Sequence, residues 1–444
     1  MNTEKLQRDP AGVAETTGDH CGAILIAGAS VRAAVQSAVR GVGLDLVAAD
    51  LYVDRDLAEL ATAVPLAENY VDLIDRVRQL KDIFPRLSHW LYTGGLENYP
   101  DLVDGVSRSL KLFGNCGDTL RAVRDPWRFA ESVRAAGFCV PEMVADGSRV
   151  PVDGTWLRKR SASAGGLGVT VWDDVAKRRY LTELAVSNSG GGAGRVVLVD
   201  DRDVTCYWQR RVRGESLGGA FVASDGEARL LGVTRQLQAD VAGRQGGMLY
   251  AGSIGPLMLG SSDIAQWQVL GERLAGDFGL QGVFGVDAIC ERGRLWPLEV
   301  NPRFTASLEI LERAFGWNAV RLHVAACRDG ELPDLQLLDG PPRIFAAKRI
   351  VYSSRKFTVD GSFGDWMQRQ PGFAIGAAGE FFEADKWPSL ADLPKVGTLI
   401  PAGAPVLTCF AQRSSELAES VDETLEALAC EVDLRASDIL RRIP

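Results

Sequence analysis

Histidine is scarce in this sequence, which has only three among its 444 residues, His20, His89 and His323. They lie far apart, so a zinc or non-haem iron site, which needs clustered nitrogen or sulfur ligands, is not expected. The eight cysteines form no C-x-x-C pair and are scattered, at positions 21, 116, 139, 206, 290, 327, 409 and 430. Such spacing is typical of buried free thiols in a reducing compartment. Any metal bound here should therefore have oxygen ligands.

Long apolar runs and an excess of positive charge are also missing. No stretch approaches the roughly 18 apolar residues of a membrane span, and the net charge of −9 argues against a nucleic-acid-binding surface. Residues 1–20 are polar and lack the apolar segment of a signal peptide, so we expect a disordered extension there. We therefore expect a cytoplasmic protein that binds small molecules, with neither nucleic acid nor a membrane as partner.

Two or three domains are expected, because 444 residues exceed what one hydrophobic core usually supports. Residues 23–54 predict a strand, a helix and a second strand joined by a Gly-Ala-Ser turn, which is a β-α-β unit of the Rossmann type. Gly28 stands without the full G-x-G-x-x-G fingerprint, so a structural α/β domain explains the unit better than dinucleotide binding does. We expect this Rossmann-like domain over residues 21–115.

A second domain is expected over residues 116–334 and a third over 335–444. The second begins with a helix at 118–137 and continues with strands that alternate in the antiparallel manner. The third is punctuated by proline and glycine, which predicts short strands in a small β-rich domain. A helix from about Ser415 to Cys430 closes the chain. The fold class is therefore α/β combined with α+β.

The segment 295–303, LWPLEVNPR, places Glu299, Asn301 and Arg303 at every second position. In a strand these three side chains share one face. An acid, an amide and a guanidinium on one face do not build a hydrophobic core, so this strand is a candidate for a functional role.

A hairpin would place a second carboxylate opposite Glu299. Residues 292–294, Arg-Gly-Arg, predict a three-residue loop, and counting back from it pairs Asp287 with Glu299. Two carboxylates directly across a strand pair repel, so a cation should lie between them. Mg²⁺ or Mn²⁺ would suit two carboxylates and the Asn301 amide oxygen, with phosphate oxygens completing the shell. A solvated or salt-bridged strand face explains the same spacing equally well.

The segment 159–169, KRSASAGGLGV, follows a predicted strand and combines Lys159 with small hydroxyl residues and three glycines. Backbone N–H groups of such a loop can approach phosphate oxygens, and the lysine adds a positive charge. The loop lacks the G-K-[ST] ending of a Walker A sequence. Alone it is better explained as a flexible loop, but together with the carboxylate hairpin it favours a binding site for a magnesium nucleotide.

These segments together resemble the ATP-grasp superfamily and, within it, the predicted ATP-dependent carboligases related to biotin carboxylase. The resemblance covers nearly the whole chain, through GASVRAAVQSAVRGVG, LYTGGLEN, the loop after Lys159, QRRVRGES, VFGVDAI, PLEVNPR and LPKVGTLIPAGAPVLT. Its most specific pattern is D-(x)11-E-x-N-x-R, which begins at Asp287. It implies an ATP-grasp fold with an N-terminal Rossmann-like pre-ATP-grasp domain and a small β-rich C-terminal domain.

The resemblance also implies roles for individual residues. Lys159 and Arg303 would be catalytic, the lysine on phosphate oxygens and the arginine on the phosphoryl group in transfer. Mg²⁺ or Mn²⁺ would be bound by Asp287, Glu299 and Asn301. ATP would be held by Lys159, Ser161, Ser163, Ala164, Gly165, Gly166, Leu167, Gly168, Gln209, Arg210, Arg211, Val212 and Glu215. In this set, residues 164–168 would close over the triphosphate, residues 209–212 would hold adenine through backbone groups, and Glu215 would reach the ribose.

Two positions depart from the family pattern. Many relatives have an Asp-Lys pair at the start of the grasp domain whose lysine contacts ATP, whereas this chain has Asp125-Pro126. Either Arg124 or Arg128 replaces that lysine, or the contact is absent. The adenine hinge usually begins with an acid, and here Gln209 stands in that place; its side-chain oxygen can accept the same hydrogen bond.

The resemblance implies an ATP-dependent, ADP-forming carboxylate-amine ligase that acts on small-molecule carboxylate and amine substrates through an acyl phosphate. Addition of an amino acid to a tetrahydromethanopterin-type one-carbon cofactor is one hypothesis, by analogy with relatives. The alternatives are carboxylation through carboxyphosphate, as in biotin carboxylase, and an ATP-binding regulator without turnover. Lys348 and Arg349 could line a substrate cleft, although a partly buried strand with a solvated basic edge explains them better. The oligomeric state stays open, with a homodimer among the alternatives.

Overall fold

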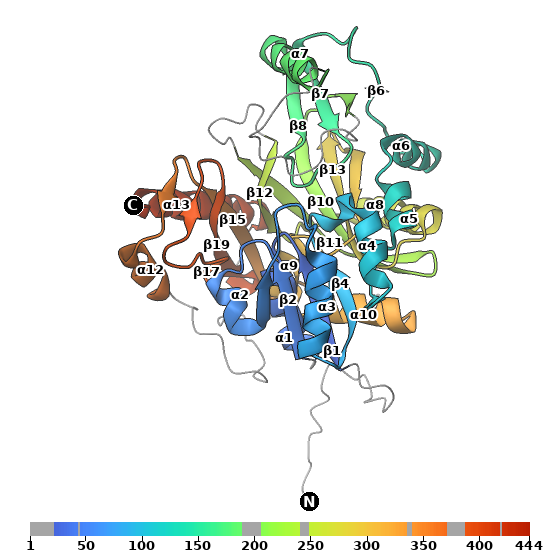
Figure 1. The fold of residues 1–444 in the computed structure, drawn as a ribbon. Coiled ribbons are helices and arrows are strands. Elements are labelled where there is room, and N and C mark those ends of the chain that lie inside the picture. The colour runs from blue at the N-terminus through green and yellow to red at the C-terminus, as the bar shows by residue number, and fades with distance from the viewer. Residues whose placement is uncertain are drawn as a thin grey trace, which may run out of the picture.

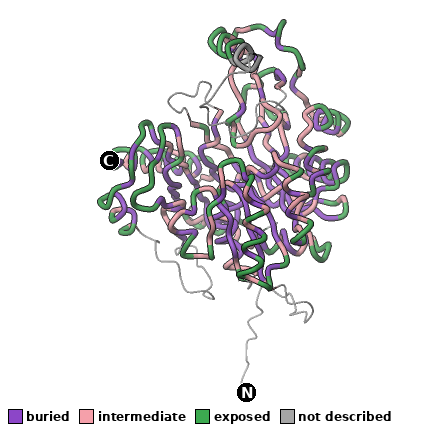
Figure 2. The backbone as a smooth tube through the Cα atoms, viewed as in Figure 1, coloured by how far each residue is buried: buried purple, intermediate pink, exposed green. Residues whose placement is uncertain are grey.

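The computed structural model describes residues 22–42, 45–188, 206–239, 248–334, 340–370, 387–417 and 420–444. The extension predicted over residues 1–20 lies outside this described part of the chain. Within it, three larger sheets of five, four and eight strands and one two-stranded ribbon carry the fold. Figure 1 shows helices packed around the sheets, and Figure 2 shows that buried residues follow the strands while exposed residues follow the outer helices.

The first sheet has the strand order β3-β2-β1-β4-β5, and all of its strand pairs are parallel. Its strands are β1 (Ala23–Gly28), β2 (Asp45–Asp50), β3 (Thr62–Pro65), β4 (Leu87–Tyr92) and β5 (Lys111–Leu112). The helices between them are α1 (Arg32–Gly41), α2 (Arg55–Leu60), α3 (Leu73–Ile83), the 3₁₀ helix η1 (Leu96–Asn98) and α4 (Pro100–Ser107). Every residue of β1 is buried, as expected for a parallel strand covered on both faces. The predicted Rossmann-like architecture is therefore present.

Protein atoms fill the space around the turn after β1, where a phosphate group would otherwise bind. A Cβ on Gly28 would lie 2.1 Å from Thr93 Oγ1, so glycine is needed for close packing against the end of β4. Asp50 accepts hydrogen bonds from the amides of Val31 (2.7 Å) and Val53 (2.9 Å) at the start of α1 and after β2. A carboxylate thus occupies the helix N-terminus at which a dinucleotide phosphate would bind. This geometry supports the structural role that the incomplete fingerprint indicated.

The helix predicted over residues 118–137 is two helices, α5 (Gly117–Val123) and α6 (Pro126–Ala135). Asp125 is extended, with φ −73° and ψ 113°, because the residue before a proline is disfavoured in helical conformation. Its carboxylate accepts hydrogen bonds from the amides of Trp127 (2.8 Å) and Arg128 (3.2 Å). Asp125-Pro126 is therefore an N-cap followed by proline at the first helical position.

The second sheet is antiparallel with the order β6-β9-β7-β8. It contains β6 (Met143–Val144), β7 (Asp153–Arg160), β8 (Val169–Asp173) and β9 (Cys206–Arg210), and α7 (Asp174–Asn188) follows β8. The buried side chains of Trp156, Trp172 and Trp208 form the core of this small layer. The layer carries the strand that precedes the predicted glycine loop.

The largest sheet has eight strands in the order β14-β13-β10-β11-β12-β15-β19-β17, and its pairs are antiparallel. These strands are β10 (Glu215–Ser224), β11 (Glu227–Ala239), β12 (Leu249–Gly255), β13 (Gly282–Glu291), β14 (Arg294–Asn301), β15 (Ile344–Tyr352), β17 (Leu390–Ala391) and β19 (Pro405–Ser414). The ribbon pairs β16 (Phe357–Thr358) with β18 (Leu399–Ile400). The sheet continues across the domain boundary predicted at residue 334, because β15 pairs with β12. The division of the chain into three domains stays a prediction.

The remaining helices are α8 (Ser261–Phe278), α9 (Leu308–Phe315), α10 (Ala319–Asp329), α12 (Gly361–Gln368), η3 (Ser415–Leu417) and α13 (Val421–Arg442). The closing helix predicted at Ser415–Cys430 is thus displaced. The Ser420 side chain caps its start, and buried residues continue to Ile439. None of the helices in the described ranges combines the length and hydropathy that a membrane crossing requires.

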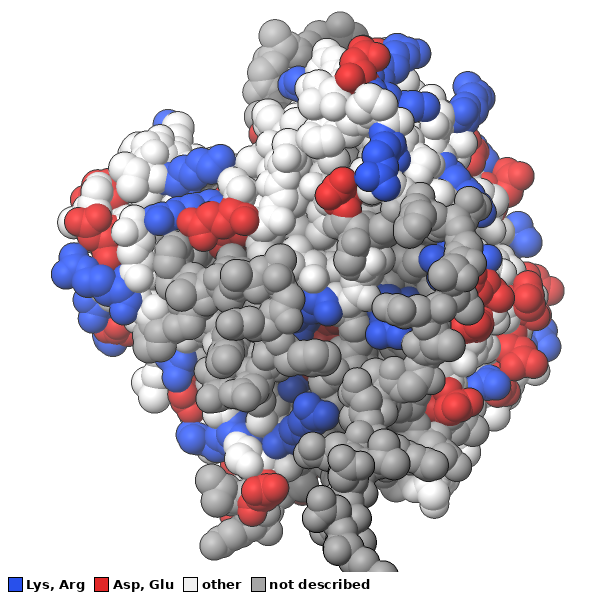
Figure 3. Space-filling model, turned by 90° about the horizontal axis from the view of Figure 1, so that it is seen from below, with Lys and Arg blue, Asp and Glu red and all other residues white. Residues whose placement is uncertain are grey.

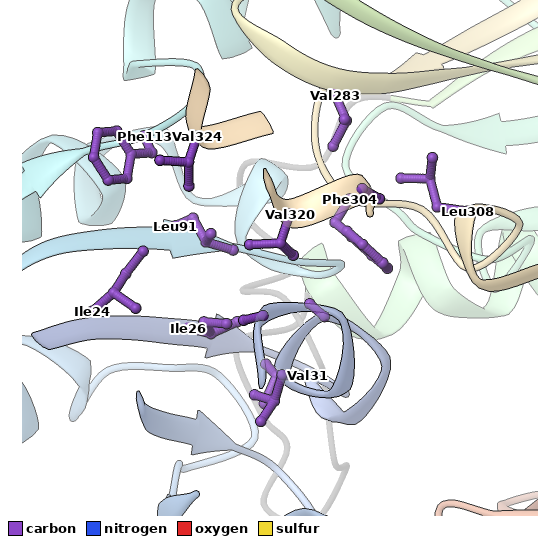
Figure 4. Close-up of a cluster of buried hydrophobic side chains, with 14 of the residues drawn as sticks. Ile24, Ile26, Val31, Leu91, Phe113, Val283, Phe304, Leu308, Val320 and Val324 are labelled. Carbon is purple, nitrogen blue, oxygen red and sulfur yellow. The ribbon is translucent and has the colours of Figure 1, made fainter. Parts of the chain in front are cut away.

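One hydrophobic cluster joins the first sheet to the largest one. Figure 4 shows Ile24, Ile26 and Leu91 of the parallel sheet facing Val320 and Val324 of α10. Phe304 and Leu308, which follow β14, belong to the same cluster. The first sheet is therefore packed against the part of the chain that carries the candidate site.

Positive and negative side chains are interspersed on the face shown in Figure 3.

Candidate active site

The hairpin of β13 and β14 places Asp287 directly opposite Glu299, as predicted. The turn differs from the prediction: Arg292 and Gly293 form a two-residue loop with φ values of 52° and 76°. Positive φ at both central residues suits the twist of a tight hairpin. A register shift between Asp287 and Ala288 leaves Leu298 as an extra residue, and this bulge restores the pairing that a three-residue loop would give.

Asp287 is a partly buried carboxylate beside a second one. It accepts hydrogen bonds from Gln236 Nε2 (2.7 Å) and Asn301 Nδ2 (3.0 Å). Burial, followed by the negative charge of Glu299, raises its pKa to about 7. The cations of the site, Arg303 among them, therefore do not offset burial and the charge of Glu299 at Asp287.

The pKa of Glu299 is shifted in the opposite direction to that of Asp287. Burial opposes its ionisation, but the positive charges of Lys159 and Arg124 outweigh burial and lower its pKa. Glu299 is therefore the ionised member of the pair, and a further cation would be needed to ionise both at neutral pH.

A hard divalent cation fits this arrangement. The described residues hold no group of three or more His, Cys, Asp or Glu side chains placed to bind a metal, so the candidate set is two carboxylates and the Asn301 amide oxygen. Carboxylate and amide oxygens are the ligands that Mg²⁺ accepts, usually with water or phosphate oxygens completing the shell. The uncompensated charge at Asp287 and the donor set both agree with the predicted metal.

Lys159 lies on β7 and is only 6% exposed. Its Nζ donates to Gln209 Oε1 at 3.4 Å on the neighbouring strand β9. Burial opposes its positive charge, but Tyr207 and Glu299 outweigh burial and raise its pKa. The sheet therefore holds a charged lysine within the electrostatic reach of the carboxylate pair.

The glycine loop contacts the start of β12 through Gly165 and Gly166. The Gly165 carbonyl accepts from the Tyr250 amide at 3.0 Å, and a Cβ on Gly166 would lie 1.9 Å from the Met248 carbonyl oxygen. Gly165 and Gly166 both have positive φ, 60° and 81°. Glycine is required here because the loop lies against the start of β12. Ser163 Oγ donates back to the Arg160 carbonyl at 3.2 Å, and the Leu167 side chain is exposed.

Arg124 approaches the glycine loop from α5. Its Nη2 donates to the carbonyls of Ser163 (2.5 Å) and Ser161 (3.4 Å) and to Asn98 Oδ1 (3.3 Å). Arg124, Ser161 and Glu299 line one small pocket. Arg128 is exposed on α6, so Arg124 is the better placed of the two arginines considered for the missing lysine.

The predicted hinge, residues 209–212, begins in the last two residues of β9 and continues beyond the strand. The amides of Arg210 and Arg211 donate to the carbonyls of Glu142 (2.8 Å) and Thr155 (2.9 Å). These two amides are therefore engaged within the protein, which directs the predicted adenine contact to the carbonyls and to Val212. Glu215 begins β10, and its carboxylate lies 3.7 Å from Arg235 Nη1.

Arg303 lies just after β14, and its amide donates to the Asn301 carbonyl at 2.8 Å. The alternation predicted for the strand therefore ends at Asn301, because Pro302 and Arg303 leave the ladder. The side chain still joins the site: Nη2 donates to Asn301 Oδ1 at 3.1 Å and lies 2.8 Å from Glu97 Oε1.

Sequence reasoning missed two residues that contact the candidate site, Glu97 and Asn98 of η1. Glu97 Oε1 accepts from Arg303 Nε at 2.9 Å, and a Cβ on Gly94 would lie 3.4 Å from the Arg303 guanidinium carbon. Asn98 accepts from Arg124. The segment LYTGGLEN contributes only to the family resemblance. Glu97 lies 206 positions before Arg303, so no local pattern connects the two residues.

Lys348 corrects another prediction. It lies on β15 between β12 and β19, so it is on a central strand and is only 4% exposed. Its Nζ lies 3.2 Å from Glu309 Oε2. A solvated basic edge is therefore wrong for Lys348, whereas Arg349 is partly exposed and pairs with Asp433 at 3.2 Å.

Residues 123–307 match the family model of the ATP-grasp domain. The protein contains an ATP-grasp domain. All of the site residues predicted from the sequence fall inside the matched range, whereas Glu97 and Asn98 precede it. No protein of curated function matches the sequence.

Solved structures of ATP-grasp enzymes resemble the whole chain. An L-amino acid ligase from Bacillus licheniformis is 15% identical, with a TM-score of 0.63 over 93% of this chain and 97% of that chain. The biotin carboxylase domain of a Hydrogenobacter thermophilus 2-oxoglutarate carboxylase, solved with MgADP, ADP and bicarbonate, is 14% identical, with a TM-score of 0.63 over 88% and 86%. An N5-carboxyaminoimidazole synthetase from Staphylococcus aureus, solved with ADP, is 12% identical, with a TM-score of 0.60 over 93% and 97%. The predicted ATP-grasp fold is confirmed.

Proposed function

We propose that the protein is an ATP-dependent, ADP-forming carboxylate-amine ligase that works through an acyl phosphate. One observation carries the proposal: Glu299, paired across the hairpin with Asp287, shares a pocket with Arg124 and Ser161 of the glycine loop and lies within the electrostatic reach of Lys159. This arrangement brings a metal-binding face and a phosphate-binding face together. The Bacillus licheniformis structure of similar fold is named as an amino acid ligase, which supports this chemistry by analogy.

ATP would lie between the second sheet and the β13–β14 hairpin. Lys159 and Arg124 would neutralise phosphate oxygens, and residues 161–168 would cover the triphosphate through backbone groups and the Ser161 and Ser163 hydroxyls. Residues 209–212 would hold adenine, and Glu215 would reach the ribose after leaving Arg235. Gln209 would keep Lys159 directed at the phosphates through the contact already present.

Asp287, Glu299 and Asn301 would hold Mg²⁺ or Mn²⁺, which supplies charge neutralisation at the β- and γ-phosphates when bound. Gln236 and Arg303 would orient this set, because each donates to one of its members.

The chemistry requires two displacements. A carboxylate oxygen of the first substrate attacks the γ-phosphorus, the bond to ADP breaks, and an acyl phosphate forms. The amine nitrogen of the second substrate then attacks the acyl carbon, and inorganic phosphate leaves with the electrons of the C–O bond and takes up the proton that the nitrogen loses. Lys159 and Arg303 would stabilise the negative charge that develops on the transferred group.

Carboxylation through carboxyphosphate is the second candidate. It is favoured by the fold shared with the Hydrogenobacter thermophilus domain, whose structure holds bicarbonate beside MgADP and ADP. In that reaction bicarbonate takes the place of the carboxylate substrate, and the same phosphate-binding residues are required.

The deciding assay is ADP release from ATP and Mg²⁺ with added pools of carboxylates and amines, including the L-amino acids and tetrahydromethanopterin-type precursors. Hydroxylamine traps an acyl phosphate as a hydroxamate, so the wild type should form hydroxamate with one carboxylate pool. ADP release that depends strictly on bicarbonate would favour the second candidate. Tight ATP binding without stimulation by any pool would contradict both and favour a regulator.

A further inference from the structure

Glu97 uses only one of its carboxylate oxygens. Its Oε1 faces Arg303 Nε at 2.9 Å and Nη2 at 2.8 Å. Its Oε2 is buried and has no hydrogen-bond partner among the described residues. The residue as a whole is 2% exposed. An acceptor of this kind is unfavourable when it is left alone, so it marks a position where a donor from a ligand would be stabilising.

The surroundings of Glu97 select the chemistry of that donor. Arg303 already neutralises one side of the carboxylate, and its guanidinium lies against Gly94. Tyr70 and Tyr92 are close enough for burial and the negative charge of Glu97 to raise their pKa values, yet neither donates to Oε2. An N–H group would complete the carboxylate, whereas a second anion would be repelled by it.

We propose that Glu97 Oε2 accepts a hydrogen bond from the amine substrate and orients its nitrogen toward the acyl carbon. This assignment rests on the proposed ligase function. The acyl phosphate would lie beside Asn301 and the carboxylate pair, within reach of Arg303. Arg303 would then contact both the leaving phosphate and the residue that holds the amine. The amine-binding residue comes from the first sheet's domain, outside the matched ATP-grasp range.

Glu97→Gln tests the assignment with little change of shape. Glutamine keeps an acceptor oxygen for Arg303 but presents an NH₂ group where Oε2 was, so it repels an amine donor. Asp101→Asn is the matched control, because the Asp101 carboxylate is 96% exposed and pairs only on the surface with Arg121. For each variant the KM of the most effective L-amino acid of the pool assay and the rate of hydroxamate formation with saturating hydroxylamine are measured.

The assignment predicts that Glu97→Gln raises the KM of the amino acid amine at least tenfold more than it slows hydroxamate formation, while Asp101→Asn changes neither more than twofold. Equal losses in both assays would overturn the assignment and leave Glu97 as a residue that only positions Arg303. A wild type that forms no hydroxamate at all would overturn the ligase proposal and the assignment with it.

A second measurement does not depend on a folded variant. With Mg²⁺ and a non-hydrolysable ATP analogue bound to the wild type, the same amino acid should slow hydrogen exchange of the amides in residues 95–98. Unchanged exchange in this segment, when the amino acid supports turnover, would overturn the assignment.

Discussion

Two clusters of charged side chains in this protein differ in how far neighbouring cations compensate one carboxylate. Around Glu309 of α9, three cations converge on one carboxylate: Arg32, Lys348 and Arg313. Burial opposes its ionisation, but these cations lower its pKa well below the usual range. At the β13–β14 hairpin, in contrast, burial and Glu299 raise the pKa of Asp287 to about 7. Burial alone therefore does not decide the charge of a carboxylate; the charged groups that face it do.

The two clusters also differ in what they connect. Arg32 belongs to α1, Glu309 to α9 and Lys348 to β15, and Arg32 also pairs with Asp392 at 2.9 Å. The Glu309 cluster thus ties the first sheet to the C-terminal strands. The hairpin cluster faces the glycine loop and Arg124 instead. We interpret the Glu309 cluster as structural and the hairpin cluster as the place where a ligand supplies the missing charge.

Glu309→Gln should show the largest effect on stability. It leaves buried cations without their carboxylate, and breaking a buried ion pair in this way costs about 3–5 kcal/mol. Denaturant unfolding measures the loss. Glu59→Gln, which removes a carboxylate from a half-exposed pair with Arg55, is the control and should change little. A Glu309→Gln protein as stable as the wild type would remove the distinction between the two clusters.

Asp287→Asn should affect activity rather than stability. If Asp287 binds the proposed metal, its loss should raise the barrier by about 3 kcal/mol, or roughly a hundredfold in rate, by analogy with removal of a single transition-state contact. Because the folded pKa of Asp287 is raised, its charge destabilises the folded protein as pH rises through about 7. The variant should therefore unfold at no lower denaturant concentration than the wild type at pH 8. A large loss of stability with intact ADP release would reverse the interpretation.

His323 offers a pH test of a buried group that is fully satisfied. Its Nδ1 accepts from the Val283 amide at 2.9 Å, Nε2 lies 3.0 Å from the Phe113 carbonyl, and burial lowers its pKa to about 4. The unfolded chain binds the proton first, so stability should fall as pH decreases from about 6.5 to about 4. At about 1.4 kcal/mol per pKa unit the loss approaches roughly 3 kcal/mol. The stability difference between wild type and His323→Gln should shrink over this range; a constant difference would contradict the shift.

Gly166→Ala should cost about 1–2 kcal/mol from the left-handed backbone, and more because its Cβ would lie 1.9 Å from the Met248 carbonyl oxygen. Gly165→Ala shares the positive φ but meets nothing within 4 Å, so it isolates the contact. Thermal unfolding and the KM for ATP are measured for both. If the two variants behave alike, the loop's packing against β12 does not matter.

Sequence reasoning placed the central pair correctly because alternation and hairpin counting depend only on local backbone geometry. The predicted three-residue loop was wrong, but the predicted pairing of Asp287 with Glu299 was correct, because the bulge at Leu298 compensates for the shorter loop. The break at Asp125-Pro126 also had a local signal, the residue before proline, which was not used for the helix boundary.

Other parts of the site depend on tertiary packing. Glu97 meets Arg303 only because the first sheet packs on the helices after β14, and nothing near Glu97 in the sequence indicates this. The central position of Lys348 could not be predicted, because the pairing of β15 with β12 joins residues far apart in the chain. Glu309 lies only six residues after Arg303 but belongs to another cluster. The direction of α9 decides this, and the separation along the sequence does not indicate it.

The pairing of β12 with β15 has a consequence for how the protein can be divided. Gly252 pairs with Arg349 and Gly255 with Ala346, so a chain cut after residue 334 would expose a row of unpaired backbone groups along β12. The same strand begins where the glycine loop is anchored, through the Tyr250 amide. The last quarter of the chain, after residue 334, therefore completes the sheet that carries the candidate site and cannot be removed as a separate unit.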